Sequence, residues 1–469
     1  MSEPDREGNS REDVRQMDEK GNLACMARAI PRKGTALSVL AAMLCSISVA
    51  QTPGQGAPAS PLTLRQAVEL ALRTHPDLVS ANASKEAARE GLKQAESQFW
   101  PNLTIEYNQN WGHTTSGSQG PLNTRRGDLV LSYKLLDSGQ REAQRQGAQA
   151  GYWAGQDQEL DTRATVIENV ATSFYDVLRK LALVTVADAN VKRSQSTLDL
   201  VKAQVEAGTA AAKDIYQAQA DFEIAKVALI QAQNDADQAV ALLKQAIGIE
   251  SDDALRLAPA DGQGIVPSSV ENLTSLKRMA FERRPDVAQF RAQVDRSQAA
   301  VRLARADAGP SLIVDGSITG AFAPNGSESH IAGLTLSFPI FDGGFVRSVV
   351  REAEQNLRAA QANLASKRLA VGTEVEQAYR NFLTDQAALP AAISAQKAAQ
   401  VNYDAASEAR REGVSSIIDV IQAQTLLVQA DTNRVQAEFN LYSSAVVLAR
   451  TVGRIEALFS VAPTIGGTK

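Results

Sequence analysis

Apolar residues recur along two long stretches at the spacing of helices that pack along a continuous seam. In the first stretch the intervals alternate between three and four residues, at Ile167, Val170, Phe174, Val177, Leu181 and Val184. In the second stretch, intervals of four and three residues alternate without interruption, at Ala218, Phe222, Ala225, Leu229, Ala232, Ala236, Ala239, Leu243 and Ala246. This spacing is typical of coiled coils. It predicts an antiparallel hairpin of two long helices over residues 139–247, with its turn at Gly208.

The pattern occurs twice. The two copies share a turn glycine, an aspartate that opens the return helix and an Ala-Gln pair, which are Gly208 with Gly413, Asp214 with Asp419, and Ala218-Gln219 with Ala423-Gln424. The runs that precede the two turns, 139–206 and 344–412, have nearly equal lengths, so the turns should lie at the same depth. Pro390 interrupts only the second run and predicts a kink or loosened hydrogen bonding there.

Before each long run, apolar and polar residues alternate as they do in half-buried strands. The apolar set begins at Leu103, Ile105 and Tyr107 and continues, after a polar loop at 111–126, at Leu129, Leu131, Tyr133 and Leu135. We predict strand pairs at about 102–136 and 311–341. Each pair is followed by a turn rich in small residues, Asp137-Ser138-Gly139 and Asp342-Gly343-Gly344.

The chain therefore divides into two structural repeats, 62–248 and 271–455. An irregular connector, 249–270, joins them, a coiled-coil hairpin over 344–452 closes the second repeat, and a tail, 456–469, follows. Residues 1–50 have the basic start, apolar run and small-residue end of a cleaved secretory signal, and 51–61 form a flexible leader. The true start could also be Met17 or Met26, and Cys45 offers the rival interpretation of a lipidated protein.

Composition narrows the function. The net charge of −5 gives no reason to expect nucleic acid as a partner. The two cysteines, Cys25 and Cys45, precede the expected cleavage site, so the mature chain would contain neither disulfides nor reactive thiols. Three histidines lie at element ends or in loops, at His75, His113 and His330, and no phosphate-binding loop, nucleophile elbow or zinc motif occurs. We expect no enzyme activity, no cofactor and no metal site.

The predicted strands raise a problem of closure. After the signal no stretch reaches the roughly 18 consecutive apolar residues of a membrane-spanning helix. Four amphipathic strands could cross an outer membrane only as part of a barrel, because unpaired edge groups are not tolerated in lipid. Bacterial barrels begin at eight strands. Self-association would solve the problem, and three chains would leave room for a channel.

The duplicated order of helix, two strands, long helix, glycine turn and return helix resembles the TolC-like outer-membrane efflux factors. The residues that carry the resemblance are Pro76-Asp77 with Pro285-Asp286, the run from Phe338 to Gly344, the two Gly-to-Asp turns and the two Ala-Gln pairs. The resemblance covers about residues 62–455. It implies a mainly α fold with a β-barrel part, built as a homotrimer with a twelve-stranded barrel in the outer membrane and a twelve-helix periplasmic barrel. Trp100 and Trp111 would lie at the barrel's polar borders or pack at strand ends.

Members of this family serve as exit ducts of tripartite efflux pumps or type I secretion systems. The resemblance therefore implies a periplasmic adaptor and an inner-membrane pump of the RND, ABC or MFS type as partners, besides outer-membrane lipid. It also implies that the turns dock the adaptor, here through Gly208, Thr209, Gly413, Val414 and Ser415. The cargo is left open between drugs, metal ions and secreted proteins.

The resemblance also implies a gate at the tips of the hairpins. An aspartate that matches Asp419 lies at the tip constriction in the family, where a second acid can follow three residues later. This chain has Gln422 at that position, so a carboxylate ring would be single and would bind cations more weakly. The simpler role of Asp214 and Asp419 is that of a helix cap or first-turn carboxylate.

Two arginines precede the second turn and leave two interpretations. Arg410 and Arg411 could be solvated helix surface, the usual place of charged residues. They could instead tie neighbouring hairpins together at Asp214 or Asp419, although the family often has a tyrosine at the aligned position. A second hypothesis for the whole chain is a secreted periplasmic coiled-coil scaffold without a channel.

Overall fold

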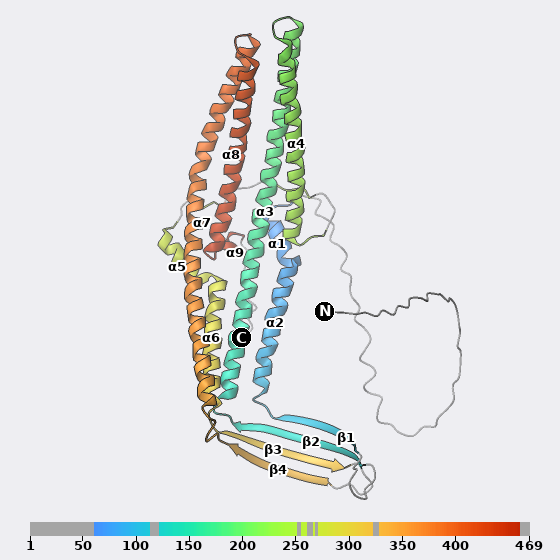
Figure 1. The fold of residues 1–469 in the computed structure, drawn as a ribbon, viewed down its shortest axis with the longest axis vertical. Helices are drawn as coiled ribbons and strands as arrows, with labels where there is room; N and C mark the ends of the chain where they lie inside the picture. The colour runs from blue at the N-terminus through green and yellow to red at the C-terminus, as the bar shows by residue number, and fades with distance from the viewer. Residues whose placement is uncertain are drawn as a thin grey trace, which may run out of the picture. The chain divides into compact units, whose positions relative to one another are not determined.

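A computed structural model describes residues 61–112, 122–250, 255–259, 266–267, 271–321 and 328–459. The expected signal, nearly all of the flexible leader, most of the connector and the last ten residues lie outside this range. The described elements belong to the unit formed by residues 57–469. Their order is the one expected from the sequence, with each repeat contributing two shorter helices, two strands and a pair of long helices (Figure 1).

The first repeat contains α1 (Leu64–Thr74), α2 (Pro76–Ser97), β1 (Asn102–Gly112), β2 (Leu122–Leu136), α3 (Gln140–Glu206) and α4 (Ala212–Ile247). The second contains α5 (Leu273–Arg283), α6 (Pro285–Ala306), β3 (Ser311–Ala321), β4 (Glu328–Ser337), α7 (Phe345–Arg411) and α8 (Ile417–Thr451), and is followed by the short α9 (Ile455–Leu458). The long helices α3 and α7 each have 67 residues, and α2 and α6 each have 22. The equal depth that the sequence predicts for the two turns follows from these equal lengths.

Local sequence explains where the helices begin. Thr63 forms a capping box with Gln66 at the start of α1, which satisfies two backbone N–H groups that a helix otherwise leaves unpaired. Pro76 and Pro285 occupy the first turns of α2 and α6, where their missing N–H costs nothing. Helix α7 continues as one element through Pro390. The kink expected there stays a prediction.

The four strands form one antiparallel sheet in the order β1-β2-β3-β4. The sheet joins the two repeats, because β2 of the first pairs with β3 of the second. The first strands reach further into the predicted loop than expected, since β1 and β2 stay paired to Gly112 and Leu122. Strand β4 ends earlier than expected, at Ser337, which pairs with Ser311, the first residue of β3.

The register gives the sheet two different faces. One face carries apolar side chains on all four strands, at Leu103, Ile105, Tyr107, Leu129, Leu131, Tyr133, Leu312, Val314, Ile318, Leu334 and Leu336. Many of these are exposed in the single chain, for example Ile105 at 81% and Leu334 at 70%. The opposite face carries hydrogen-bonded polar groups, including the Thr319 hydroxyl, which donates to Asp128 at 2.6 Å.

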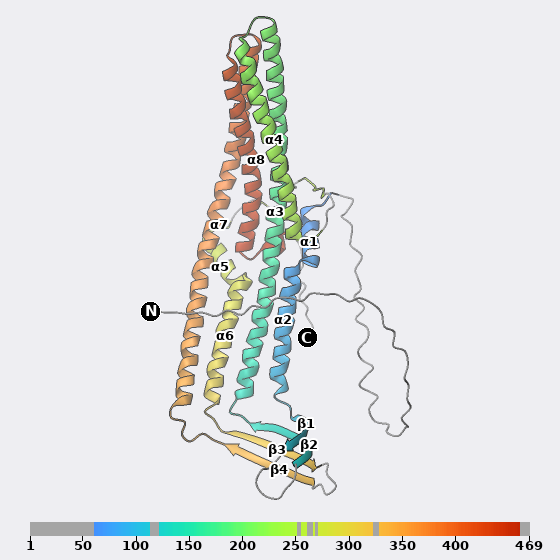
Figure 2. The same cartoon turned by 45° about the vertical axis from the view of Figure 1, so that its right-hand side comes forward.

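The helical core lies where the short helices α1 and α5 pack beside the long ones (Figures 1 and 2). Helix α1 packs with α3, α4 and the end of α8 around the fully buried Phe174 and Tyr175. Helix α5 packs with α7 and α8 around Phe382. The end of the chain adds to the first cluster, because Ile455 and Phe459 are buried. The tail expected from residue 456 is thus helical and packed as far as it is described.

The coiled-coil seam predicted for α4 is confirmed, since its nine positions are all buried or partly buried. Among the described residues, no helix is long and apolar enough to cross a membrane.

Candidate functional site at the hairpin tips

Both hairpins turn in the same way. Gly208 and Gly413 follow the C-caps of α3 and α7 with φ of 74° and 78°. This left-handed conformation strains any residue with a Cβ, which explains the glycine at each turn. The next residue then closes the turn, as the Thr209 N–H donates to Gln204 at 2.8 Å and the Val414 N–H donates to Ala409 at 2.9 Å. Thr209 and Val414 are exposed at the outermost ends of the hairpins.

The return helices begin differently. Helix α8 starts with a capping box in which the Asp419 N–H donates to the Ser416 hydroxyl at 3.2 Å and the Ser416 N–H donates to the Asp419 carboxylate at 2.9 Å. The N-cap of α4 is Ala211, which has no side chain that can cap the helix. The first-turn position expected for Asp214 and Asp419 is confirmed, but only Asp419 takes part in capping. Its side chain is exposed, as is that of Gln422.

The carboxylate of Asp214 faces the other hairpin. The Arg410 guanidinium lies 3.4 Å from it and also donates to the Ser415 carbonyl at 3.2 Å. The two side chains are only 10% and 15% exposed. Of the two interpretations of Arg410, solvated helix surface is therefore wrong, because the first hairpin packs over it, and the contact with Asp214 is observed. Arg411 is solvated as expected and pairs with Glu408 of its own helix.

A backbone contact and an apolar contact support the same tie. The Gln204 side-chain amide donates to the Arg410 carbonyl at 3.1 Å, and so joins the last turns of α3 and α7. One turn further in, Ile417 at the start of α8 is buried among Leu198, Val201 and Ala218 of the first hairpin. The two tips of one chain are therefore in direct contact.

A buried polar cluster continues this contact along the coiled coil. The Gln424 amide of α8 donates to Asn190 at 2.9 Å and to Ser194 at 2.6 Å, both on α3. It also lies 3.3 Å from the Asp221 carboxylate of α4, which accepts from Ser194 at 2.9 Å. Gln424 is 2% exposed and its Oε1 has no hydrogen-bond partner among the described residues. Three helices from both hairpins meet at this cluster.

Further from the tip, Arg193 of α3 bridges the same two hairpins. Arg193 of α3 lies 3.7 Å from the Asp431 carboxylate of α8, and its guanidinium is 5.9 Å from the centre of the Tyr403 ring. Burial raises the pKa of the Tyr403 hydroxyl.

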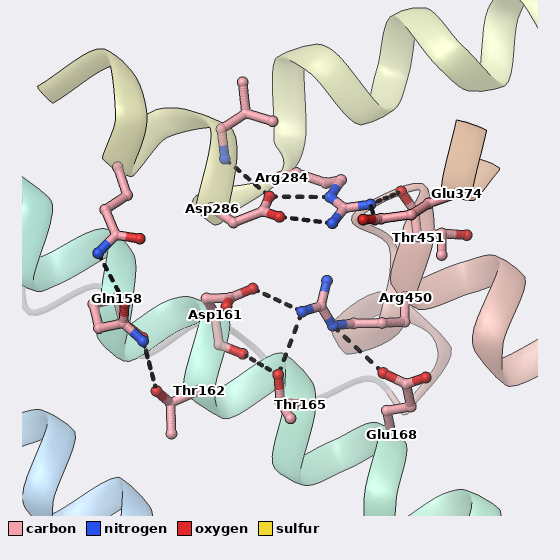
Figure 3. A network of polar contacts seen from close by, with 12 residues as sticks. Gln158, Asp161, Thr162, Thr165, Glu168, Arg284, Asp286, Glu374, Arg450 and Thr451 are labelled. Carbon is pink, nitrogen blue, oxygen red and sulfur yellow. Dashed lines mark hydrogen bonds and ion pairs between the residues drawn. The ribbon is translucent and has the colours of Figure 1, made fainter. Parts of the chain in front are cut away.

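At the foot of α8, salt bridges join α8 to α3 and the start of α6 to α7 (Figure 3). Arg450 donates to Asp161 of α3 at 2.8 Å and lies 3.6 Å from Glu168, whose pKa is raised by burial. Beside it, Arg284 makes two hydrogen bonds to Asp286 and an ion pair with Glu374 of α7. Burial alone would raise the pKa of Asp286, but its hydrogen bonds from Arg284 and Lys367 lower it to about 2.

The contacts thus differ in kind along the hairpins. At the foot, Arg450 of α8 pairs with Asp161 at 2.8 Å and lies 3.6 Å from Glu168. At the tip, the two hairpins share the ion pair of Arg410 with Asp214 at 3.4 Å, the hydrogen bond from Gln204 and a small apolar patch.

Sequence reasoning missed the polar cluster. Gln424 was noted as part of a repeated pair, but its buried position between two hairpins was not foreseen. The signal was present, because Ala423 is the seam residue and an adjacent glutamine on a narrow seam falls against the neighbouring helices. Its equivalent, Gln219, instead bonds Glu223 of its own helix.

Known proteins match this chain over most of its length. The family model described as outer membrane efflux protein matches residues 67–249 and 276–454. The chain is 24% identical to the outer membrane protein TolC of Escherichia coli over 411 residues, which are 84% of this chain and 82% of that protein. It is 25% identical to protein CyaE of Bordetella pertussis over 90% of this chain and 94% of that protein. A crystal structure of CusC superposes with a TM-score of 0.74 at 18% identity, covering 87% of this chain and 95% of that one.

Proposed function

Because the chain belongs to the outer membrane efflux protein family, we propose that its twin hairpin tips are the gate of an export channel. The protein is an outer-membrane channel of the efflux and type I secretion kind, with its long helices in the periplasm. The proposal concerns how three copies build the channel, what holds its periplasmic end closed and where its partners dock.

We infer a homotrimer from the sheet. Each copy supplies four strands with one apolar and one polar face, and β1 and β4 each have one edge that pairs with no other described strand. Three copies would pair these edges into a closed twelve-stranded barrel with the apolar face towards lipid and the polar face towards water. A secreted scaffold without a channel would have no use for such an apolar face, so the sheet favours the channel.

The gate rests on the tie between the tips. With Arg410 on Asp214 and Ile417 among the residues of the first hairpin, the tips of each copy are held together and the channel is narrow. Separation of the hairpins would break this ion pair and the hydrogen bond from Gln204 and would expose a small apolar patch, while the salt bridges at the foot of α8 stay intact. The longer ion pair at the tip, 3.4 Å against 2.8 Å for Arg450 with Asp161 at the foot, is the observation that carries the proposal.

Asp214 and Asp419 then have different roles. Asp214 is neutralised by Arg410, whereas Asp419 is exposed and its charge is not paired by a basic side chain among the described residues. Three copies would bring three Asp419 carboxylates to the mouth, a ring that favours cations. With Gln422 in place of a second acid, we expect one such ring and weak cation binding.

The exposed turns are the proposed docking sites for a periplasmic adaptor that links the channel to an inner-membrane pump. Gly208, Thr209, Gly413 and Val414 are exposed, and Ser415 is partly exposed. A side chain built at either glycine would meet nothing within 4 Å, so another protein's backbone can approach closely. We leave the type of pump open between the RND, ABC and MFS classes.

Cross-linking the tips tests the gate. Thr209→Cys and Val414→Cys would be combined in one chain and joined by a bismaleimide in cells. We expect cross-linking to stop export while heat-sensitive trimers persist, and each single variant, treated in the same way, to export normally. Export that continues through fully cross-linked trimers would refute a gate at the tips.

A further inference from the structure

The internal duplication also predicts how one copy meets the next, an inference that rests on the proposed homotrimer. The helices α2 and α6 are related by a shift of 209 positions, and α3 and α7 by a shift of 205. The same two shifts convert the register of the first strand pair into that of the second. Asn102 opposite Ser132 becomes Ser311 opposite Ser337, as observed. The repeats are therefore equivalent residue by residue around the sheet.

Among the described strands, the pairing of β2 with β3 is the one that the duplication leaves without a copy within the chain. Adding 205 to the residue numbers of β2 gives β4, and subtracting 209 from those of β3 gives β1. The equivalent pairing is therefore that of β4 with β1 of a neighbouring copy. The observed pairs Leu131 with Gly316 and Tyr133 with Val314 become Leu336 with Tyr107 and Phe338 with Ile105. All four of these shifted positions are apolar, and they are 59% to 81% exposed in the single chain. The apolar face would then continue from copy to copy.

The same shift accounts for the early end of β4. Strand β2 continues to Leu136, which corresponds to Phe341, whereas β4 ends at Ser337. Ile340 and Phe341 are 92% and 91% exposed. The register shift between Lys134 and Leu136 begins directly after the position equivalent to Pro339, and bulges are among the few places where a sheet tolerates proline. Residues 338–341 are thus built to pair with another strand.

Where these strand pairings end, the glycine lies on opposite sides of the two contacts, the one within a copy and the one between copies. Within the chain, Gly309 lies so close to Ser138 that a Cβ on Gly309 would be 2.1 Å from the serine Oγ. The equivalent positions between copies hold Trp100 in place of Gly309 and Gly343 in place of Ser138. Trp100 is 76% exposed, and a Cβ built on Gly343 meets nothing within 4 Å. Ser138 and Gly343 share a positive φ, 53° and 65°, so the backbones match.

We propose that Trp100 of one copy lies over Gly343 of the next, and that β1 of the first copy extends β4 of the second through Phe341 in the register of β2 with β3. Where the chain contacts itself, the glycine is on the helix α6 side and the side chain on the β2 side. Between copies the arrangement is reversed, with the indole on the α2 side and the glycine on the β4 side. The seam between copies is thereby distinguished from the seam within a copy. A contact of one patch with a different patch closes into a ring when the rotation from copy to copy adds up to a full turn.

Disulfide mapping tests the register in the full-length chain with Cys25→Ser and Cys45→Ser. Cross-strand pairs alternate between hydrogen-bonded and non-hydrogen-bonded types, with Cα atoms about 5.5 and about 4.5 Å apart, both within disulfide reach. One pair is therefore taken from each face, Tyr107→Cys with Leu336→Cys and Glu106→Cys with Ser337→Cys. We expect at least one of the two to form covalent dimers and trimers on oxidation. The controls move the β1 cysteine by two residues, to Gln109→Cys and Asn108→Cys.

The outcomes separate this inference from the function on which it rests. If trimers form but the shifted controls cross-link better, or no pair cross-links, the proposed register is wrong while the channel stands. If the unmodified protein forms no trimer, the proposed assembly fails and the inference fails with it. Preferential cross-linking of the predicted pairs supports both.

The contact of Trp100 with Gly343 is tested separately by heat dissociation of the trimer in detergent. Trp100→Ala should lower the dissociation temperature of the trimer. The indole is mostly exposed in the single chain, so its removal should change the stability of the chain itself little. Trp153→Ala is the matched control, because Trp153 is also exposed, at 46%, but lies on α3 away from this junction. A dissociation temperature that Trp100→Ala leaves unchanged, or that the two variants lower equally, would contradict the contact.

Discussion

Replacing Arg410 with alanine should open the channel. In the closed tip the guanidinium and the Asp214 carboxylate are 3.4 Å apart and mostly out of water. At an effective dielectric constant of 20, two charges at this separation attract by about 5 kcal/mol. Much of this is offset by the cost of removing both groups from water. The unpaired Nε of Arg410 reduces the net value further.

We therefore expect about 1–2 kcal/mol per chain in favour of the closed tip, which corresponds to a factor of about 5–30 between closed and open populations. Purified Arg410→Ala channels in planar lipid bilayers should show higher mean conductance than the unmodified protein. Cells that carry the variant should become sensitive to antibiotics that are too large to cross an intact outer membrane.

Two controls isolate the ion pair. Arg411→Ala removes the neighbouring charge, which is exposed and pairs within its own helix, and should leave conductance unchanged. The exchanged pair Arg410→Asp with Asp214→Arg should restore part of the closed state that either single change loses. Intact Arg410→Ala trimers with the conductance of the unmodified channel would refute the role assigned to this tie.

Three further predictions follow from buried or exposed polar groups. Gln424→Leu should raise conductance and lower the melting temperature of the trimer, because Asp221 loses a donor worth about 1–3 kcal/mol; unchanged values would show that the cluster is incidental. Burial raises the pKa of Asp157 to about 6, so stability should fall as pH rises from about 4 to 6, by about 1–2 kcal/mol after allowance for partial exposure. Asp157→Asn should remove this fall in melting temperature, and an unaltered pH profile would contradict it. Asp419→Asn should weaken block of the conductance by multivalent cations, and equal block would exclude a ring at this position.

Much of the fold could be predicted from the sequence because it follows local rules. The spacing of apolar residues along α4 defined its packing face, and Pro76 and Pro285 marked the starts of α2 and α6. The turn glycines were recognisable because few other residues adopt a positive φ without strain. The duplication made each of these features recognisable twice.

The sequence offered the contact of Arg410 with Asp214 only as one of two interpretations, because contacts between the hairpins depend on how two distant segments come together. The burial of Arg410 follows from the lateral packing of the first hairpin on the second, which no periodicity within α7 records. The pairing of β2 with β3 unites the repeats, although the sequence suggested only separate strand pairs. The end of β4 differed because its expected partner belongs to another copy in the assembly we propose.

The central claim is that the two hairpin tips of each chain separate when the channel opens. The most direct test is the distance between spin labels on Thr209→Cys and Val414→Cys, measured by pulsed electron resonance in trimers that carry one doubly labelled chain. We predict one short distance in the resting channel and a longer distance when Arg410→Ala is added. An unchanged distance in channels whose conductance has risen would contradict the claim.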